Sequence, residues 1–207
     1  MKTVLARGVA FLLVIGFVCT PVWATCGGGG GGGGGGMTGG GKDAGGDNPT
    51  VYHVPWKLHD NDKPAKAGLI LYWFPSSKEE LAKSPLKESR DLSLYAAQCV
   101  AMELADGRMP KAADFRGAST LPFAVLATPD DIVIGKIENK GGKLNIADVE
   151  KLVANEVKTR KANVDTSLKD AKTKEAAGDK DAAIKLFRSV VEQKCMFADK
   201  AKDAAKE

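Results

Sequence analysis

The stretch AGLILYWFPSSKEELAKSP, residues 67–85, determines the expected fold. Its apolar run at 69–74 is rich in residues that favour β structure and has the length of a buried strand. Pro75 ends the run, and Ser76 or Ser77 can cap a helix whose positively polarised first turn contains two glutamates. A buried strand that leads into a helix N-terminus is where α/β proteins often place their chemistry.

The residues that follow predict further helices and strands around this unit. A helix through residues 86–98 should bend, or stop and restart, at Ser84-Pro85, because proline cannot donate a backbone hydrogen bond. Residues 99–104 predict a second parallel strand, in which Cys99 would be a small buried apolar residue. An edge strand is expected at 51–54.

A second segment, FRGASTLPFAVLATPDDIVIGKI at 115–137, predicts an antiparallel hairpin that turns at 129–131. The apolar positions of residues 146–157 recur at helical spacing, which predicts an amphipathic helix after the hairpin. The resulting fold class is α/β, a small sheet covered by helices.

These two segments together resemble the thioredoxin-like family over residues 51–160. In that family a buried strand ends in an aromatic pair, Cys-x-x-Cys opens a helix, and a kink proline follows. Tyr72-Trp73 match the aromatic pair and Pro85 matches the kink proline. Pro122 matches the proline that is cis in the family and leads into a strand.

The resemblance also implies that redox activity is absent. Ser77 and Glu80 stand at the two cysteine positions, so the motif reads Ser-Lys-Glu-Glu, and Leu71 occupies the position of a buried acid in the family. A hydroxyl group does not ionise readily and cannot form the mixed disulfide. A serine nucleophile would need a base, for which Lys78 and Glu80 are the candidates, and a third orienting group. Ser77 and Lys78 are adjacent and would diverge on a helix, so Ser77 is interpreted as a helix cap.

A peptide-binding role is the function that the resemblance implies instead. Related domains receive extended peptides in a groove that would here be formed by Trp73, Ser77, Leu121 and Pro122. The expected partner is a protein or an extended peptide. We expect no catalytic residue and no cofactor.

The histidines and the charge exclude two other classes of site. His53 and His59 are spaced too widely for a helical metal-ligand pair, so they are interpreted as solvated loop residues and no metal is expected. The net charge of +4 over 207 residues is small, which argues against a nucleic-acid partner.

Residues 1–24 have the charged start and short apolar core of a signal peptide, which predicts export to the periplasm or cell envelope. Cleavage after Ala24 and lipidation of Cys26, which would anchor the protein to a membrane, both remain open. Residues 25–50 contain an unbroken glycine run and are expected to be a disordered linker. This linker is either a spacer or a tolerated repeat expansion.

Residues 161–207 change to an Ala- and Lys-rich composition that predicts helices at 168–177 and 180–193. The pair resembles a tetratricopeptide-like helical hairpin through Ala171, Gly178, Ala183 and Phe187. One such unit cannot bury its own apolar face, so it should pack on the helix at 149–157 or on a second molecule, with Phe187 as the anchor.

The sequence thus favours an exported, redox-inactive thioredoxin-like protein that acts as a non-catalytic interaction module of the cell envelope. One alternative is a protein related to thiol-disulfide oxidoreductases that uses a lone cysteine, Cys99 or Cys195. A purely structural envelope protein is the third possibility.

Overall fold

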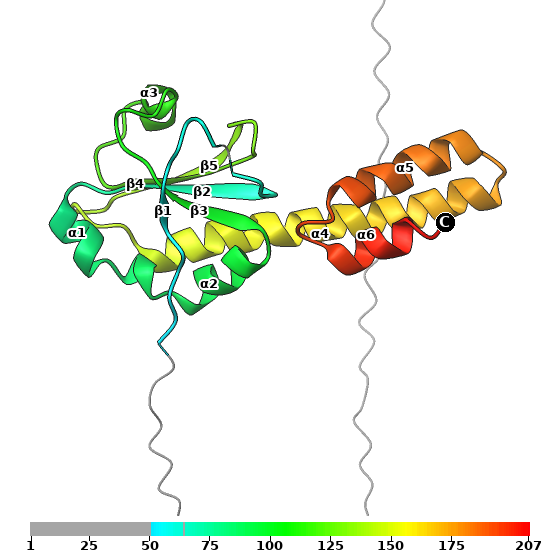
Figure 1. Cartoon of the computed structure of the whole chain (residues 1–207), viewed down its shortest axis with the longest axis horizontal. Coiled ribbons are helices and arrows are strands. Elements are labelled where there is room, and N and C mark those ends of the chain that lie inside the picture. The colour runs from blue at the N-terminus through cyan, green and yellow to red at the C-terminus, as the bar shows by residue number, and fades with distance from the viewer. Residues whose placement is uncertain (1–50, 64) are drawn as a thin grey trace, which may run out of the picture. The chain divides into compact units, whose positions relative to one another are not determined.

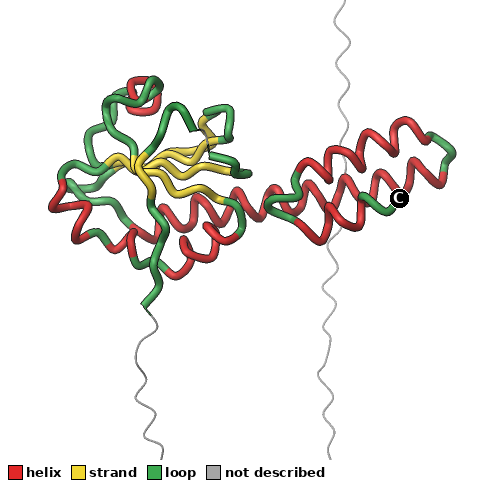
Figure 2. Tube along the Cα trace, in the orientation of Figure 1, coloured by secondary structure: helices red, strands yellow, loops and turns green. Residues whose placement is uncertain are grey.

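The computed structural model describes residues 51–63 and 65–207, and the signal-peptide and linker predictions lie outside this range. A five-stranded mixed sheet has the strand order β1-β3-β2-β4-β5. Figures 1 and 2 show helices on both sides of it and a helical extension at the C-terminal end. The strands are β1 (Lys57–Leu58), β2 (Leu69–Phe74), β3 (Val100–Leu104), β4 (Phe123–Ala127) and β5 (Val133–Glu138). The helices are α1 (Lys78–Lys83), α2 (Arg90–Ala97), α3 (Ala112–Arg116), α4 (Ile146–Ala176), α5 (Lys180–Glu192) and α6 (Ala198–Ala204).

The central strand is β2, as its apolar sequence predicts, and all six of its residues are buried. It pairs in parallel with β3 and antiparallel with β4, and β4 continues into the predicted hairpin with β5. The predicted edge strand at 51–54 is wrong. The edge strand is β1, which pairs in parallel with β3, whereas Val54 is buried beneath the sheet.

Alternating residues of β2 fill two cores, one on each face of the sheet. Leu69, Leu71 and Trp73 pack against α2 and the first half of α4. Ile70, Tyr72 and Phe74 pack against α3 and the loops beside it. The two sides are visible in Figure 1, where α3 lies opposite α2.

Three serines set where the helices after β2 begin. Ser77 accepts a hydrogen bond from the backbone N–H of Glu80 and caps α1, which confirms one of the two predicted caps. The helix stops at Ser84, and a short 3-10 helix (Pro85–Lys87) follows it. Ser89 then caps α2, so the predicted restart occurs over several residues.

The long helix α4 differs from the expected pair of separate helices. It runs without a break for 31 residues through the composition change after residue 157. Gly178, with φ +81°, and the cap Asp179 then turn the chain into α5, as predicted. Among residues 51–63 and 65–207, no helix combines the length and apolar character needed to cross a membrane.

Phe187 is buried against the second half of α4 and not against residues 149–157. The cluster around it contains Val164, Ala171, Ala183 and Val190. The helical hairpin therefore does have its own small core. Ile184, on the same helix as Phe187, is 46% exposed.

Candidate functional site

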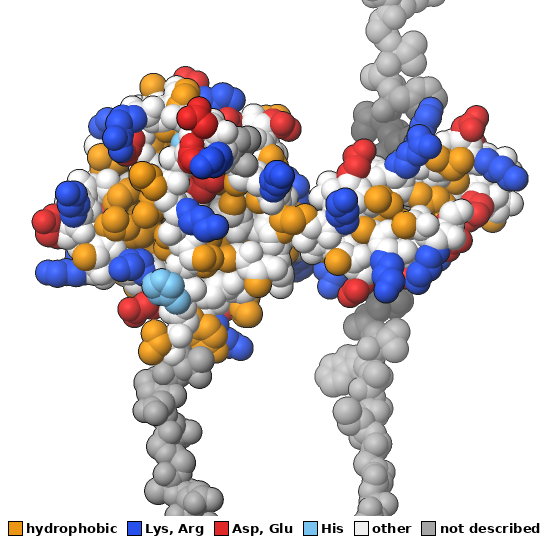
Figure 3. Space-filling view, viewed as in Figure 1, with side chains coloured by type: hydrophobic (Ala, Val, Ile, Leu, Met, Phe, Trp, Pro, Cys, Tyr) orange, Lys and Arg blue, Asp and Glu red, His pale blue; other side chains and the backbone are white. Residues whose placement is uncertain are grey.

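The three parallel strands end together at one edge of the sheet. Leu58 at the end of β1 and Trp73 near the end of β2 are both paired with Leu104 at the end of β3. Two hollows open beyond these strand ends, one of about 500 Å³ and one of about 320 Å³. Open α/β sheets commonly bind ligands outside the carboxyl ends of their strands, so this edge is the candidate site. Figure 3 shows hydrophobic side chains gathered over the end of the sheet near α1.

The smaller hollow lies between the end of β2 and the start of β4. Phe74 and Phe123 stack with their ring centroids 4.3 Å apart and contribute to its lining. Leu121, which is 39% exposed, also lines it, as does Arg116 at the end of α3. The lining is mostly apolar and also contains Arg116 and Asp106, which suits an extended peptide more than a small polar metabolite.

The predicted cis bond between Leu121 and Pro122 is present. Phe123 pairs directly with Phe74, so the bond lies across from Pro75, where the chain turns toward Ser77. Leu121 and Pro122 thus occupy the same edge as the Ser77 turn.

Trp73 does not line the hollow, contrary to the expected groove. It is fully buried on the other face of the sheet, where its ring packs edge-on against Trp56 at 5.3 Å. Its indole N–H is buried and finds no hydrogen-bond acceptor of normal geometry among the described residues. Ser77 also lies outside the hollow lining.

The two positions that match the family cysteines stabilise the start of α1. While Ser77 accepts the N–H of Glu80, the Glu80 carboxyl group accepts the backbone N–H of Ser76 at 2.8 Å. Partial burial raises the pKa of Glu80, although the hydrogen bond from Ser76 and the nearby Trp73 indole act in the opposite direction. The arrangement is a reciprocal cap of the helix.

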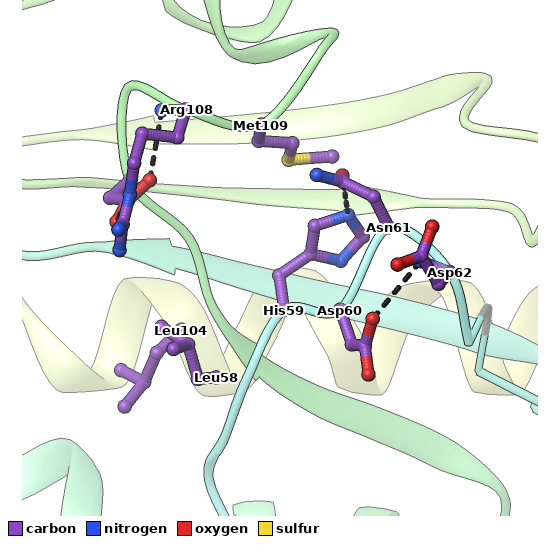
Figure 4. A pocket seen from close by; sticks show the side chains of 9 residues that line it. Leu58, His59, Asp60, Asn61, Asp62, Leu104, Arg108 and Met109 are labelled. Carbon is purple, nitrogen blue, oxygen red and sulfur yellow. Dashed lines mark hydrogen bonds and ion pairs between the residues drawn. The ribbon is translucent and has the colours of Figure 1, made fainter.

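The larger hollow contains a histidine that sequence reasoning assigned to solvent (Figure 4). His59 Nδ1 lies 2.5 Å from the buried carboxyl group of Glu103, and Nε2 lies 3.0 Å from Asn61 Oδ1. Both ring nitrogens thus face oxygen atoms, one of a carboxyl group and one of an amide. The prediction of a solvated loop histidine is wrong for His59, whereas His53 is exposed. One signal was present in the sequence: Glu103 is a charged residue in a buried strand, where it requires a partner.

A second set of polar side chains lies near His59, toward the β4–β5 turn. The Tyr72 hydroxyl donates to Asp131 Oδ1 at 2.9 Å, and Lys111 Nζ lies 3.4 Å from Asp131 Oδ2. Burial and the carboxylate of Asp131 raise the pKa of Tyr72, so this hydroxyl remains protonated and acts as a donor. Together with His59 these groups line a further small cavity of about 180 Å³. Among the described residues, no three His, Cys, Asp or Glu side chains are grouped to hold a metal ion.

Cys99 is not the buried apolar residue that its sequence context predicts. It is partly exposed and forms a disulfide bond with Cys195. The bond lies at the amino end of β3, whereas the two hollows lie at the carboxyl ends. A separation of 96 residues gave no sequence signal for this pair.

The chain matches no protein-family model, and a search of curated proteins finds no similar sequence.

Proposed function

We propose that this protein is an exported, redox-inactive thioredoxin-like domain that binds an extended peptide segment of another protein. The observation that carries the proposal is the apolar hollow beside Leu121, at a strand-end edge where the two cysteine-equivalent positions are Ser77 and Glu80. The hollow offers apolar contacts, and the groups at the adjacent helix start are engaged in capping.

Two features support the thioredoxin-like assignment. The central β2 is followed by the capped helix α1 and then by the parallel strand β3. A cis proline precedes β4, which pairs antiparallel with β2 on its other side. The tetratricopeptide-like assignment is supported by the burial of Ala171, Ala183 and Phe187 in one cluster.

The lone-cysteine oxidoreductase is the weaker candidate because Cys99 and Cys195 are bonded to each other. A reactive thiol needs a free thiolate in an activating environment. An insulin-reduction assay separates the two functions. We expect turnover no higher than that of a buffer blank, and clear turnover would contradict the redox-inactive assignment.

The disulfide also supports export, since structural disulfides persist in oxidising compartments outside the cytosol. If Cys26 is lipidated, Cys26→Ser moves the protein from the membrane to the soluble fraction, because a lipid chain contributes about 0.8 kcal/mol per buried CH₂. Fractionation followed by immunoblotting measures the shift. If both forms are soluble, cleavage after Ala24 is the correct account.

Peptide binding is tested by selecting binders for residues 49–207 from a displayed library of random peptides. We expect Leu121→Glu to abolish binding because it places a charge in the apolar hollow. Ile132→Glu is the matched control, since Ile132 is a more exposed apolar residue on the β4–β5 turn. Selected peptides that bind both variants equally, or a library that yields no binders, would contradict the proposal.

A further inference from the structure

The Cys99–Cys195 disulfide joins the sheet to the C-terminal helices at one point. Cys99 lies between α2 and β3 and has a φ of 68°, in the left-handed region that a non-glycine residue rarely adopts. Cys195 lies in the turn between α5 and α6, and the two Cα atoms are 5.7 Å apart. The only other covalent path between these regions runs through the hairpin β4–β5 and the long helix α4.

The segment next to Cys195 packs into the sheet core over Gly68. Met196 is buried there, and a Cβ atom at residue 68 would lie 2.4 Å from its Cγ, so only glycine leaves room for it. Gly68 N–H donates to the Cys99 carbonyl at 2.8 Å, and Arg160 of α4 donates to the Gly68 carbonyl at 3.2 Å. The disulfide therefore fixes the position of Met196 against Gly68.

The two cysteine residues differ in their exposure to solvent. Cys195 is exposed, whereas Cys99 is partly buried between α2 and β3. An incoming thiolate attacks the sulfur that it can reach, and the other sulfur becomes the leaving group. Cys195 is the more exposed of the two bonded cysteines.

We propose that this disulfide is a site of thiol–disulfide exchange with an external dithiol. A thiolate of the dithiol attacks Sγ of Cys195, and the bond to Cys99 breaks with the electron pair remaining on Cys99. The second thiolate of the dithiol then attacks the first sulfur of the dithiol, which is bonded to Cys195 in the mixed disulfide, and releases Cys195 as a thiolate. Two electrons pass to the protein, both cysteines take up a proton, and the dithiol becomes a disulfide.

Reduction removes the covalent link between the sheet and the turn that joins α5 to α6. After the bond breaks, the packing of Met196 and Phe197 in the core under the sheet still holds this turn. The pairing of α4 with α5 is independent of the bond, because Val164, Ala171 and Phe187 form a separate cluster. The change is therefore confined to residues 193–198 and the start of β2, away from the peptide-binding hollow.

The chemical half of the proposal is tested on the full chain without denaturant. The protein is treated with dithiothreitol, alkylated and mapped by peptide mass spectrometry. We expect alkylation of both Cys99 and Cys195. With glutathione instead, we expect the mixed disulfide on Cys195. Reduction that occurs only in denaturant, or glutathione found mainly on Cys99, would overturn the assigned step.

The structural half is tested by hydrogen exchange of the oxidised and reduced protein. We expect exchange at residues 193–198 and at Gly68 to rise about tenfold on reduction, because these amides then open locally. The double variant Cys99→Ser with Cys195→Ser should show the same rise without reductant and should not respond to it. Met196→Ala keeps the bond and should show a smaller rise. Two results would overturn the inference that the disulfide holds this turn against the sheet. One is an exchange pattern that does not change on reduction. The other is an increase in exchange in Met196→Ala as large as the increase on reduction.

Discussion

His59 Nδ1 contacts the carboxyl group of Glu103 within the packed face of the sheet, where the two side chains are 14% and 11% exposed. We predict that His59→Ala lowers the free energy of unfolding by about 2–4 kcal/mol, because it leaves a buried carboxylate without its partner. His53→Ala is the control; this side chain is exposed, and its loss should change stability by less than about 0.5 kcal/mol. Urea unfolding measures both, and equal midpoints would show that the pair contributes nothing.

The adjacent glutamates of α1 should respond to pH in opposite directions. Partial burial raises the pKa of Glu80, so its ionisation opposes folding, and its contribution falls as pH rises from the ordinary value of 4.5. Hydrogen bonds from its own backbone N–H and from Ser77 lower the pKa of Glu79, so its ionisation favours folding above 4.5 and this gain is lost in acid. Relative to wild type, Glu80→Gln should gain stability with rising pH, whereas Glu79→Gln should lose it. Urea midpoints from about pH 3 to 7 measure both, and parallel curves would contradict these assignments.

Sequence reasoning located the helix caps because each depends on nearby residues, and Ser77 and Ser84 behave as their local sequence predicts. The cis bond before Pro122 was expected from the family resemblance. The partner of Glu103 and the partner of Cys99 lie far away in the chain, and no local pattern identifies them. Long-range polar contacts were therefore the part of the site that sequence alone did not provide.

The packing of β5 on α4 depends on a glycine. A Cβ atom at Gly135 would lie 2.6 Å from Leu152 Cδ1, whereas one at Gly107 would meet nothing within 4 Å. We predict that Gly135→Ala lowers the free energy of unfolding by about 1–3 kcal/mol through overpacking. Gly107→Ala is the control and should be near neutral. Thermal or urea unfolding separates them, and equal stability would mean that Leu152 moves aside at no cost.

The strands with a continuous apolar run were predicted correctly, whereas the short helices α3 and α6 were not expected. The strands β2 and β3 and the hairpin β4–β5 follow from their hydrophobic runs. The helix α4 was expected to end near residue 157, where the composition changes. Its buried residues change neighbours there, from Val149 and Val153 under the sheet to Val164 and Ala171 against α5. The apolar pattern of residues 146–157 therefore does not continue unchanged along the helix, and the unbroken helix was not apparent.

The described chain has three apolar clusters, and α4 contributes to two of them. Phe197 contacts both of these, and the disulfide lies close by, joining the same two regions. The C-terminal helices are therefore joined to the sheet by a helix, a disulfide and the packing of Met196 and Phe197. Because the hairpin core is separate, local opening of the hairpin should leave the sheet intact.

Phe187 gives the test of this independence. It is 6% exposed, and we predict that Phe187→Ala lowers the free energy of opening of the hairpin by about 3–5 kcal/mol, as expected for a buried aromatic. Hydrogen exchange should speed up in α5, α6 and α4 beyond Val164, while the amides around Val149 and Val153 stay protected. Ile184→Ala, on the same helix but 46% exposed, is the control and should change little. Loss of protection in both regions would show that the sheet and the hairpin unfold as one unit, coupled through α4 and Phe197.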